Sequence, residues 1–355
     1  IDAPQAQRLT IEDLSALDEA QRALQVRQRL QAQVQRRFDL ERGPLFCVSL
    51  LKLAEQEHVL LLTLHHIVSD GWSMGVLMRE LSTLYGAYVK GEASPLAPLA
   101  IQYADYALWQ RSWLQGEVLE GQLAYWRERL RGVETLQLPT DRPRPSTMSF
   151  AGAAVPFALS RELSDALSEL AQREGVTLYM VLLAGFQVLL SRLSGQSDIA
   201  VGSPIAGRTH RELEGLIGFF VNTLVMRTDL SGNPSFTELL QRVKEVTLGA
   251  YARQDIPFEK LVAELQPQRD LSRQPLFQVM FAWQNLPDQP LGEDKAWRAL
   301  GVEQTTSKFD LSLFMRESPD GLHATFEYAT DLFHSGTLAQ WAAHLECLLT
   351  EIAQC

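Results

Sequence analysis

The sequence predicts an α/β protein with mixed sheets. Three observations point to this class. Short apolar runs typical of strands alternate with segments of helical periodicity, and those helical segments begin at capping residues. In addition, 46% of the residues are hydrophobic and 21% are charged, as in a globular protein. At 355 residues the chain is long enough for about two hydrophobic cores.

The first part of the chain is expected to contain two helices and two strands. Residues 10–38 place apolar side chains at helical spacing, with Thr10 and Asp13 at the spacing of a capping box. Strands are expected at 45–53 and 58–64, and the second is apolar on both sides, as is typical of an interior strand. A Ser-Asp-Gly turn then leads into a helix over about 72–88.

A proline-rich stretch at 138–150 is the expected linker between two parts of the chain, 1–137 and 151–355. Beyond it, Ser160 is expected to cap a helix that ends near Gly175, and Thr177 a helix that ends near Gly195. The remaining expected elements are strands at 198–205, 219–226, 277–283, 309–315 and 322–328, and helices at 236–252 and 335–352.

Composition and charge exclude several classes of function. The net charge is -11, with no clustered basic surface in the sequence, which argues against nucleic acid or an anionic membrane as partner. No apolar run is long enough to span a bilayer, and the N-terminus does not resemble a signal peptide. Cys47, Cys347 and Cys355 lie far apart, so we expect reduced thiols of a cytoplasmic protein and no metal site.

The chemistry of the chain is expected to centre on two adjacent histidines. The sequence has no GxGxxG, Walker loop, HExxH or GxSxG motif, so nucleotide-binding and common hydrolase functions lose support. His65 and His66 end a strand, where neighbouring side chains point to opposite faces, so one faces a cleft and the other holds the turn. Asp70 and Gly71 follow in the turn. By spacing alone, these residues fit an ordinary turn as well as a catalytic site.

Five segments, in the family's order, resemble the motifs of condensation domains of nonribosomal peptide synthetases, in the subtype with an L-configured donor and acceptor. They are His65–Ser73 (HHxxxDG), Tyr103–Trp109 (YxDYAxW), Ile217–Thr223 (IGxFVNT), Gln254–Glu259 (QDxPFE) and Arg269–Gln278 (RDxSRxPLFQ). The two opening motifs of that family do not appear, so the resemblance implies an N-terminally truncated first lobe.

The resemblance implies a fold of two chloramphenicol-acetyltransferase-like lobes in a V-shaped pseudo-dimer, the first lobe incomplete. It implies an amide-forming acyltransferase that joins a donor aminoacyl or peptidyl thioester to an acceptor aminoacyl thioester. Both substrates arrive on 4'-phosphopantetheine arms, so no cofactor binds directly. The implied partners are an upstream donor and a downstream acceptor peptidyl carrier domain and an adjacent adenylation domain, in antibiotic or other secondary metabolism in the cytoplasm.

The resemblance also implies roles for single residues. His66 matches the histidine that acts on the attacking amine, either as general base or by positioning it. The backbone amide of Gly71 is a candidate donor to the oxyanion. His65 and Asp70 are expected to hold the turn, and Arg208 is the candidate partner of Asp70.

Further residues are expected around the substrates. Asn222 and Trp283 are candidates for the lining of the substrate tunnel. A second group is expected to pack the first lobe without touching substrate: Tyr103, Asp105, Tyr106 and Trp109.

Two alternatives stay open, a non-catalytic module of the same fold that docks carriers or partners, and an epimerisation domain. The Trp after Gly71 and the PLFQVMF segment favour condensation over epimerisation. A heterocyclisation domain would carry DxxxxD in place of the histidine pair.

Overall fold

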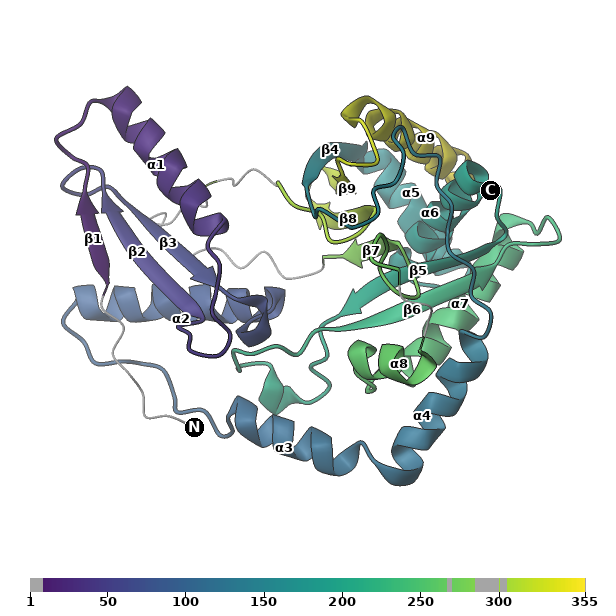
Figure 1. Cartoon of the computed structure of the whole chain (residues 1–355), viewed down its shortest axis with the longest axis horizontal. Coiled ribbons are helices and arrows are strands. Elements are labelled where there is room, and N and C mark those ends of the chain that lie inside the picture. The colour runs from purple at the N-terminus through teal and green to yellow at the C-terminus, as the bar shows by residue number, and fades with distance from the viewer. Residues whose placement is uncertain (1–8, 267–269, 285–299, 301–304, 355) are drawn as a thin grey trace. The chain divides into compact units, whose positions relative to one another are not determined.

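The computed structural model describes residues 9–266, 270–284, 300 and 305–354 (Figure 1). Contacts divide the chain into two compact units. The first comprises Ile1–Tyr103, Glu212–Phe220 and Gln289–Val302; the second comprises Ala104–Arg211, Val221–Asp288 and Glu303–Cys355. The predicted lobe boundary at 138–150 is not where these contacts divide the chain.

The first unit contains a three-stranded sheet in the order β1-β2-β3 (Figure 1). β1 (Thr10–Asp13) runs parallel to β2 (Phe46–Lys52), which pairs antiparallel with β3 (His58–Leu64) along their whole lengths. Helix α1 (Glu19–Val34) packs against β3. A small buried core of Leu14, Leu51 and Leu61 joins the sheet to this helix.

Two predictions for this unit are wrong. The expected helix over 10–38 starts too early, because Thr10–Asp13 pairs with β2 as a strand and the helix begins only after Asp18, which accepts a hydrogen bond from the Gln21 amide (2.8 Å). The strand at 58–64 was expected inside a sheet. Among the described residues β3 pairs with β2 alone, and its apolar side chains are mostly half-buried.

The second unit is built on a six-stranded mixed sheet in the order β4-β9-β8-β7-β5-β6. β7 runs parallel to β5 and β8, and the other neighbours are antiparallel. The mixed α/β class predicted from the sequence is therefore confirmed. The strands are β4 (Gly152–Ser160), β5 (Asp198–Ile205), β6 (Asn222–Asp229), β7 (Val279–Trp283), β8 (Leu311–Ser318) and β9 (Gly321–Ala329).

Seven helices are described from Tyr103 onwards: α3 (Tyr103–Trp113), α4 (Gly116–Arg129), α5 (Arg161–Arg173), α6 (Leu178–Ser194), α7 (Phe236–Tyr251), α8 (Phe258–Leu265) and α9 (Ser335–Ala353). The caps predicted for α5 and α6 are confirmed, since Ser160 accepts from the Leu163 amide and Thr177 from the Met180 amide.

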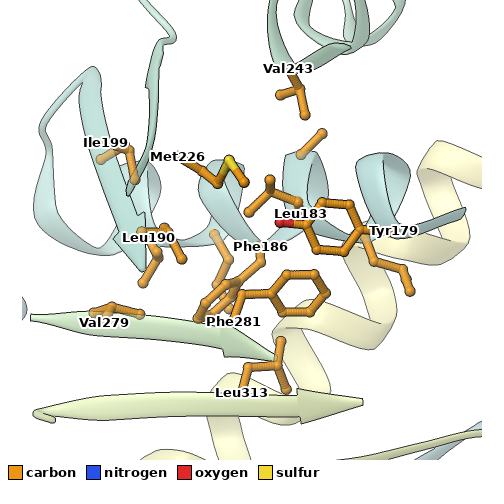
Figure 2. Packing of buried hydrophobic residues seen from close by; sticks show 14 of the residues in the cluster. Tyr179, Leu183, Phe186, Leu190, Ile199, Met226, Val243, Val279, Phe281 and Leu313 are labelled. Carbon is orange, nitrogen blue, oxygen red and sulfur yellow. The ribbon is translucent and has the colours of Figure 1, made fainter. Parts of the chain in front are cut away.

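Helix α6 lies at the centre of the core of the second unit. Leu183, Phe186 and Leu190 point from it toward Phe281 and Leu313 of the sheet (Figure 2). These five side chains are all buried, and burying side chains of this size stabilises the fold by about 1.5–3 kcal/mol each. The core fixes the sheet whose strand ends carry the second unit's motif segments.

No single helix in the described ranges is long and apolar enough to cross a membrane. Helices α5 and α6 meet that test of length and composition only when taken together, and they are bent by 106° at their junction.

Several elements of the second unit were not predicted or were misplaced. The strand expected at 219–226 is β6, which begins at Asn222 because Phe219 and Phe220 belong to the first unit. Strand β4 escaped prediction because Pro156 interrupts its pattern; a proline is tolerated there since β4 is at the sheet edge. Helices α3, α4 and α8 were not predicted either.

Helix α7 yields a testable pH dependence. Its capping box pairs the Ser235 amide with the Glu238 carboxylate (2.8 Å), and this backbone bond lowers the pKa of Glu238. The stabilisation is therefore complete above the pKa of the unfolded chain and is lost as the pH falls through the lower folded pKa. We expect Glu238→Ala to be less stable than the wild type at pH 7, with the difference shrinking in acid.

Chemical denaturation at several pH values measures this difference. Glu245→Ala, at an exposed position of the same helix, is the matched control and should show little pH-dependent difference. A Glu238→Ala deficit that stays constant down to acidic pH would contradict the capping assignment.

Candidate active site

The two histidines lie between strand β3 and helix α2 (Gly71–Val89), in the first unit. The His65 amide donates to the Leu45 carbonyl (2.9 Å), which continues the β2–β3 pairing by one residue. The chain then forms a single 3-10 turn over His66–Val68 and re-enters regular helix at Gly71. A strand end, a tight turn and a helix start thus follow one another within seven residues.

His65 holds this turn, as the sequence predicts. Its Nδ1 accepts a hydrogen bond from the Ile67 amide (3.0 Å), so its imidazole caps the 3-10 turn. The half-buried ring also meets Phe38 edge to face, with centroids 5.6 Å apart. Because Nδ1 accepts, the proton of the neutral ring lies on Nε2.

His66 lies on the other side of the turn and its side chain is exposed. Its imidazole meets the Phe219 ring edge to face, with centroids 5.4 Å apart and planes inclined by 83°. The two histidines therefore differ in environment in the way that the alternation of side chains predicts, with one bonded to the turn backbone and the other open to solvent.

Asp70 is buried, with 4% of its surface exposed, and its two carboxylate oxygens serve different elements. Oδ1 accepts from the Ser73 amide (2.8 Å) and caps helix α2. Oδ2 accepts from the amide of Phe220 (2.9 Å), 150 residues further along the chain. Hydrogen bonds from backbone N–H groups favour the charged carboxylate, and the positive end of the helix dipole adds to this.

Further hydrogen bonds fix the segment 214–220 to the start of α2. The Ser73 hydroxyl donates to the Gly218 carbonyl (2.8 Å) and accepts from the Gly218 amide (3.1 Å). The Trp72 indole donates to the Glu214 carbonyl (2.9 Å), and the Tyr103 hydroxyl donates to the Phe219 carbonyl (2.8 Å). Side chains of the first unit thereby pair with backbone groups of the segment along most of its length.

Gly218 lies in the tightest part of this arrangement. A Cβ atom there would be 2.2 Å from the Tyr103 ring. That ring also packs edge to face on Phe220, with centroids 5.1 Å apart. Burial, together with the charge of Asp70, raises the pKa of the Tyr103 phenol, which keeps its hydroxyl protonated as a donor.

The remaining predicted residues lie at different places. Gly71 is the first residue of α2. Arg208 is half-buried in the second unit, three residues beyond β5, and its pairing with Asp70 stays a prediction. Trp283 is the half-buried last residue of β7 and packs against the core of the second unit.

Asn222, expected in the tunnel, has its carboxamide bonded to backbone. Nδ2 donates to the carbonyls of Gln254 and Ile256 (both 2.8 Å), and Oδ1 accepts from the amides of Thr223 (2.9 Å) and Phe258 (3.0 Å). An amide side chain has two donor hydrogens and two acceptor lone pairs. All four are used here, so Asn222 braces the segment that precedes helix α8.

The residues expected to pack the first lobe do so in part. Tyr103 packs on Gly218 and Phe220, while Tyr106 and Trp109 contact each other in the second unit. Trp109 also stacks on Trp113 (centroids 5.3 Å apart). These contacts are internal to α3, a helix that was not predicted.

Ser73 and Phe219 were not predicted as parts of the site. Ser73 stands three residues after the cap Asp70 and is fully buried, which a capping pattern does not reveal. Phe219 is one of two adjacent phenylalanines that were expected to begin a strand. No signal within the sequence pairs either residue with the other segment, because the Ser73–Gly218 contact spans 145 residues.

In the described ranges, no three histidine, cysteine, aspartate or glutamate side chains lie together as a metal site. Cys47 is buried and Cys347 exposed, and both are free thiols, whereas Cys355 lies outside the described residues.

Comparison with known proteins places this geometry in a family. The family model of the condensation domain matches residues 1–355. The chain is 54% identical over 345 residues to part of the linear gramicidin synthase of Brevibacillus parabrevis, covering 96% of this chain and 4% of that protein. The chain therefore belongs to the condensation-domain family of nonribosomal peptide synthetases, and it spans a small part of the length of this relative.

Solved structures share the fold. A holo four-domain nonribosomal peptide synthetase bound to AMP and glycine matches with a TM-score of 0.86 at 25% identity, over 99% of this chain and 27% of that one. The X-domain from teicoplanin biosynthesis, solved in a complex with OxyB, matches with a TM-score of 0.86 at 32% identity, over 98% of this chain and 77% of that one. The prediction of a chloramphenicol-acetyltransferase-like lobe fold agrees with these matches.

The close approach at Gly218 generates a stability prediction. Gly218→Ala places a methyl group against the Tyr103 ring, so one of the two must move, and overpacking of this kind costs about 1–3 kcal/mol. In the Gly218→Ala, Tyr103→Leu double variant the clash is absent. We expect its loss of stability to be smaller than the sum of the two single losses, by about 1 kcal/mol.

Chemical denaturation of the four proteins measures this coupling. Gly75→Ala is the matched control, because Gly75 lies within α2 with no atom within 4 Å of an added Cβ. It should be neutral or gain up to about 1 kcal/mol of helix stability. Simple additivity of the Gly218 and Tyr103 losses would contradict the packing described.

Proposed function

We propose that this chain catalyses peptide-bond formation between a donor aminoacyl or peptidyl thioester and an acceptor aminoacyl thioester. The observation that carries the proposal is the exposed His66 imidazole, presented by a turn whose other residues are bonded to backbone. Membership of the condensation-domain family supports the same reaction class.

The reaction needs no nucleophile from the protein. The acceptor amine attacks the carbonyl carbon of the donor thioester, a C–N bond forms and the C–S bond breaks. The proton that the amine loses ends on the departing sulfur. A thioester is already activated, so the protein's contribution is to position the amine and to assist the transfer of this proton.

His66 is the residue we assign to that step. As a general base it takes the proton from the amine or from the tetrahedral intermediate; as a positioning group it accepts a hydrogen bond that aims the amine. Both roles need an accessible ring nitrogen, which the exposed side chain supports. Gly71 is our candidate for stabilising the oxyanion, because first-turn N–H groups of a helix have no intrahelical acceptor.

The substrates and partners follow from the family. We propose that both substrates arrive on 4'-phosphopantetheine arms, the donor from an upstream and the acceptor from a downstream peptidyl carrier domain, next to an adenylation domain. The proposed setting is the biosynthesis of a secondary metabolite in the cytoplasm. The tunnel-lining roles of Asn222 and Trp283 stay predictions, and the hydrogen bonds of Asn222 support a bracing role for it instead.

The decisive experiment tests His66→Ala. The full-length protein that contains this chain is mixed with donor-loaded and acceptor-loaded carrier domains, and the dipeptidyl thioester is measured by mass spectrometry. We expect a loss of about 10²–10⁴-fold in rate, the range that general acid–base catalysis contributes. His58→Ala, at an exposed histidine at the other end of β3, is the matched control and should keep wild-type activity.

Other outcomes identify other functions. Undiminished product from His66→Ala would remove that residue from the mechanism. An absence of product from the wild-type protein, with carriers still bound, would favour the docking module, for which the X-domain complex with OxyB is a precedent of fold. Racemised donor in place of the dipeptidyl thioester would indicate epimerisation.

A further inference from the structure

The environment of His66 contains an aromatic contact that the proposed mechanism has not used. Of the ring contacts between His66 and the described residues, the one to Phe219 is edge to face at 5.4 Å. An exposed imidazole on a turn can occupy several χ1 and χ2 rotamers. A neighbouring ring at this distance favours the rotamers that keep the contact.

The Phe219 ring can only select a rotamer if its own backbone is fixed. Four hydrogen bonds fix three consecutive residues. Gly218 exchanges two with the Ser73 hydroxyl, Phe219 accepts one from the Tyr103 hydroxyl, and Phe220 donates one to Asp70. Ser73 and Asp70 are themselves buried at the start of α2, which follows the His66 turn directly.

We propose that Phe219 is a positioning residue for His66, held in place by the hydrogen bonds of Asp70 and Ser73 to segment 218–220. The proposal rests on the proposed function of His66. It assigns Asp70 a second role besides capping α2, since its Oδ2 anchors the ring that faces the catalytic imidazole. The turn and the segment then form one rigid frame around that side chain.

A positioning role predicts a specific kinetic signature. Loss of the ring should lower the fraction of time that His66 spends in the productive rotamer, and should leave the binding of both loaded carriers unchanged. We expect Phe219→Leu to lower kcat by about 3–10-fold, with both KM values within about twofold of the wild type. Phe219→Tyr keeps the ring and should restore most of the lost kcat.

A matched control separates this effect from general loss of packing. Phe157 is half-buried in β4 of the second unit, where its ring packs on Phe326, so Phe157→Leu makes the same substitution away from His66. It should keep the wild-type kcat. Melting temperatures of all variants, measured in parallel, report any loss of folded protein.

A second measurement needs no turnover. Carbethoxylation of histidines by diethyl pyrocarbonate, followed by peptide mass spectrometry, gives the reactivity of His66 relative to the exposed His58 in the same molecule. Removal of the Phe219 ring uncovers one side of the imidazole and frees its rotation. We therefore expect this ratio to rise in Phe219→Leu and to return toward the wild-type value in Phe219→Tyr.

The two measurements distinguish the possible failures. An unchanged kcat or an unchanged reactivity ratio in Phe219→Leu overturns the positioning role, and so does a loss expressed only as a higher KM for one carrier, which indicates substrate binding. Without condensation by the wild-type protein the proposed function fails, and the reactivity ratio alone then decides whether Phe219 restrains His66.

Discussion

The Asp70 carboxylate is the interaction on which the site depends. A buried charge is unfavourable unless hydrogen bonds replace its hydration. Here two backbone amides do so from elements that are distant in sequence, Ser73 at the start of α2 and Phe220 in the segment before β6. Because the same carboxylate serves both, the start of the helix and the segment cannot move apart without leaving the charge unsatisfied.

This constraint explains why the turn needs its particular residues. His65 uses its Nδ1 on the turn itself, Asp70 uses its oxygens on the helix and the segment, and Ser73 exchanges two hydrogen bonds with Gly218. Each of these side chains is therefore occupied by backbone. His66 differs, since its imidazole is exposed and its described ring contact is to an apolar side chain. The frame absorbs the polar groups and leaves one ionisable ring available for chemistry.

Predictions from the sequence are right where the determining interactions are local. The caps Ser160 and Thr177 act within three residues, and β5 was predicted with its observed bounds because its apolar run is short and sharply ended. The start of the helix at 19 was misjudged, since pairing with β2 turns Thr10–Asp13 into a strand. The strand expected at 219 was displaced for the same kind of reason, because Phe220 bonds to Asp70 across 150 residues.

The same distinction applies to the site. His65 and Asp70 could be assigned to the turn because alternation along a strand and capping of a helix are local rules. The role of Asn222 could not, since a polar residue after an apolar run fits a cleft as well as a brace. Its four backbone hydrogen bonds decide the matter by stoichiometry, because they leave no donor or acceptor of the carboxamide for a substrate. A motif residue in this chain is thus better judged by the hydrogen-bonding capacity it has left than by its presence in the motif. By that criterion His66 keeps the capacity that proton transfer requires.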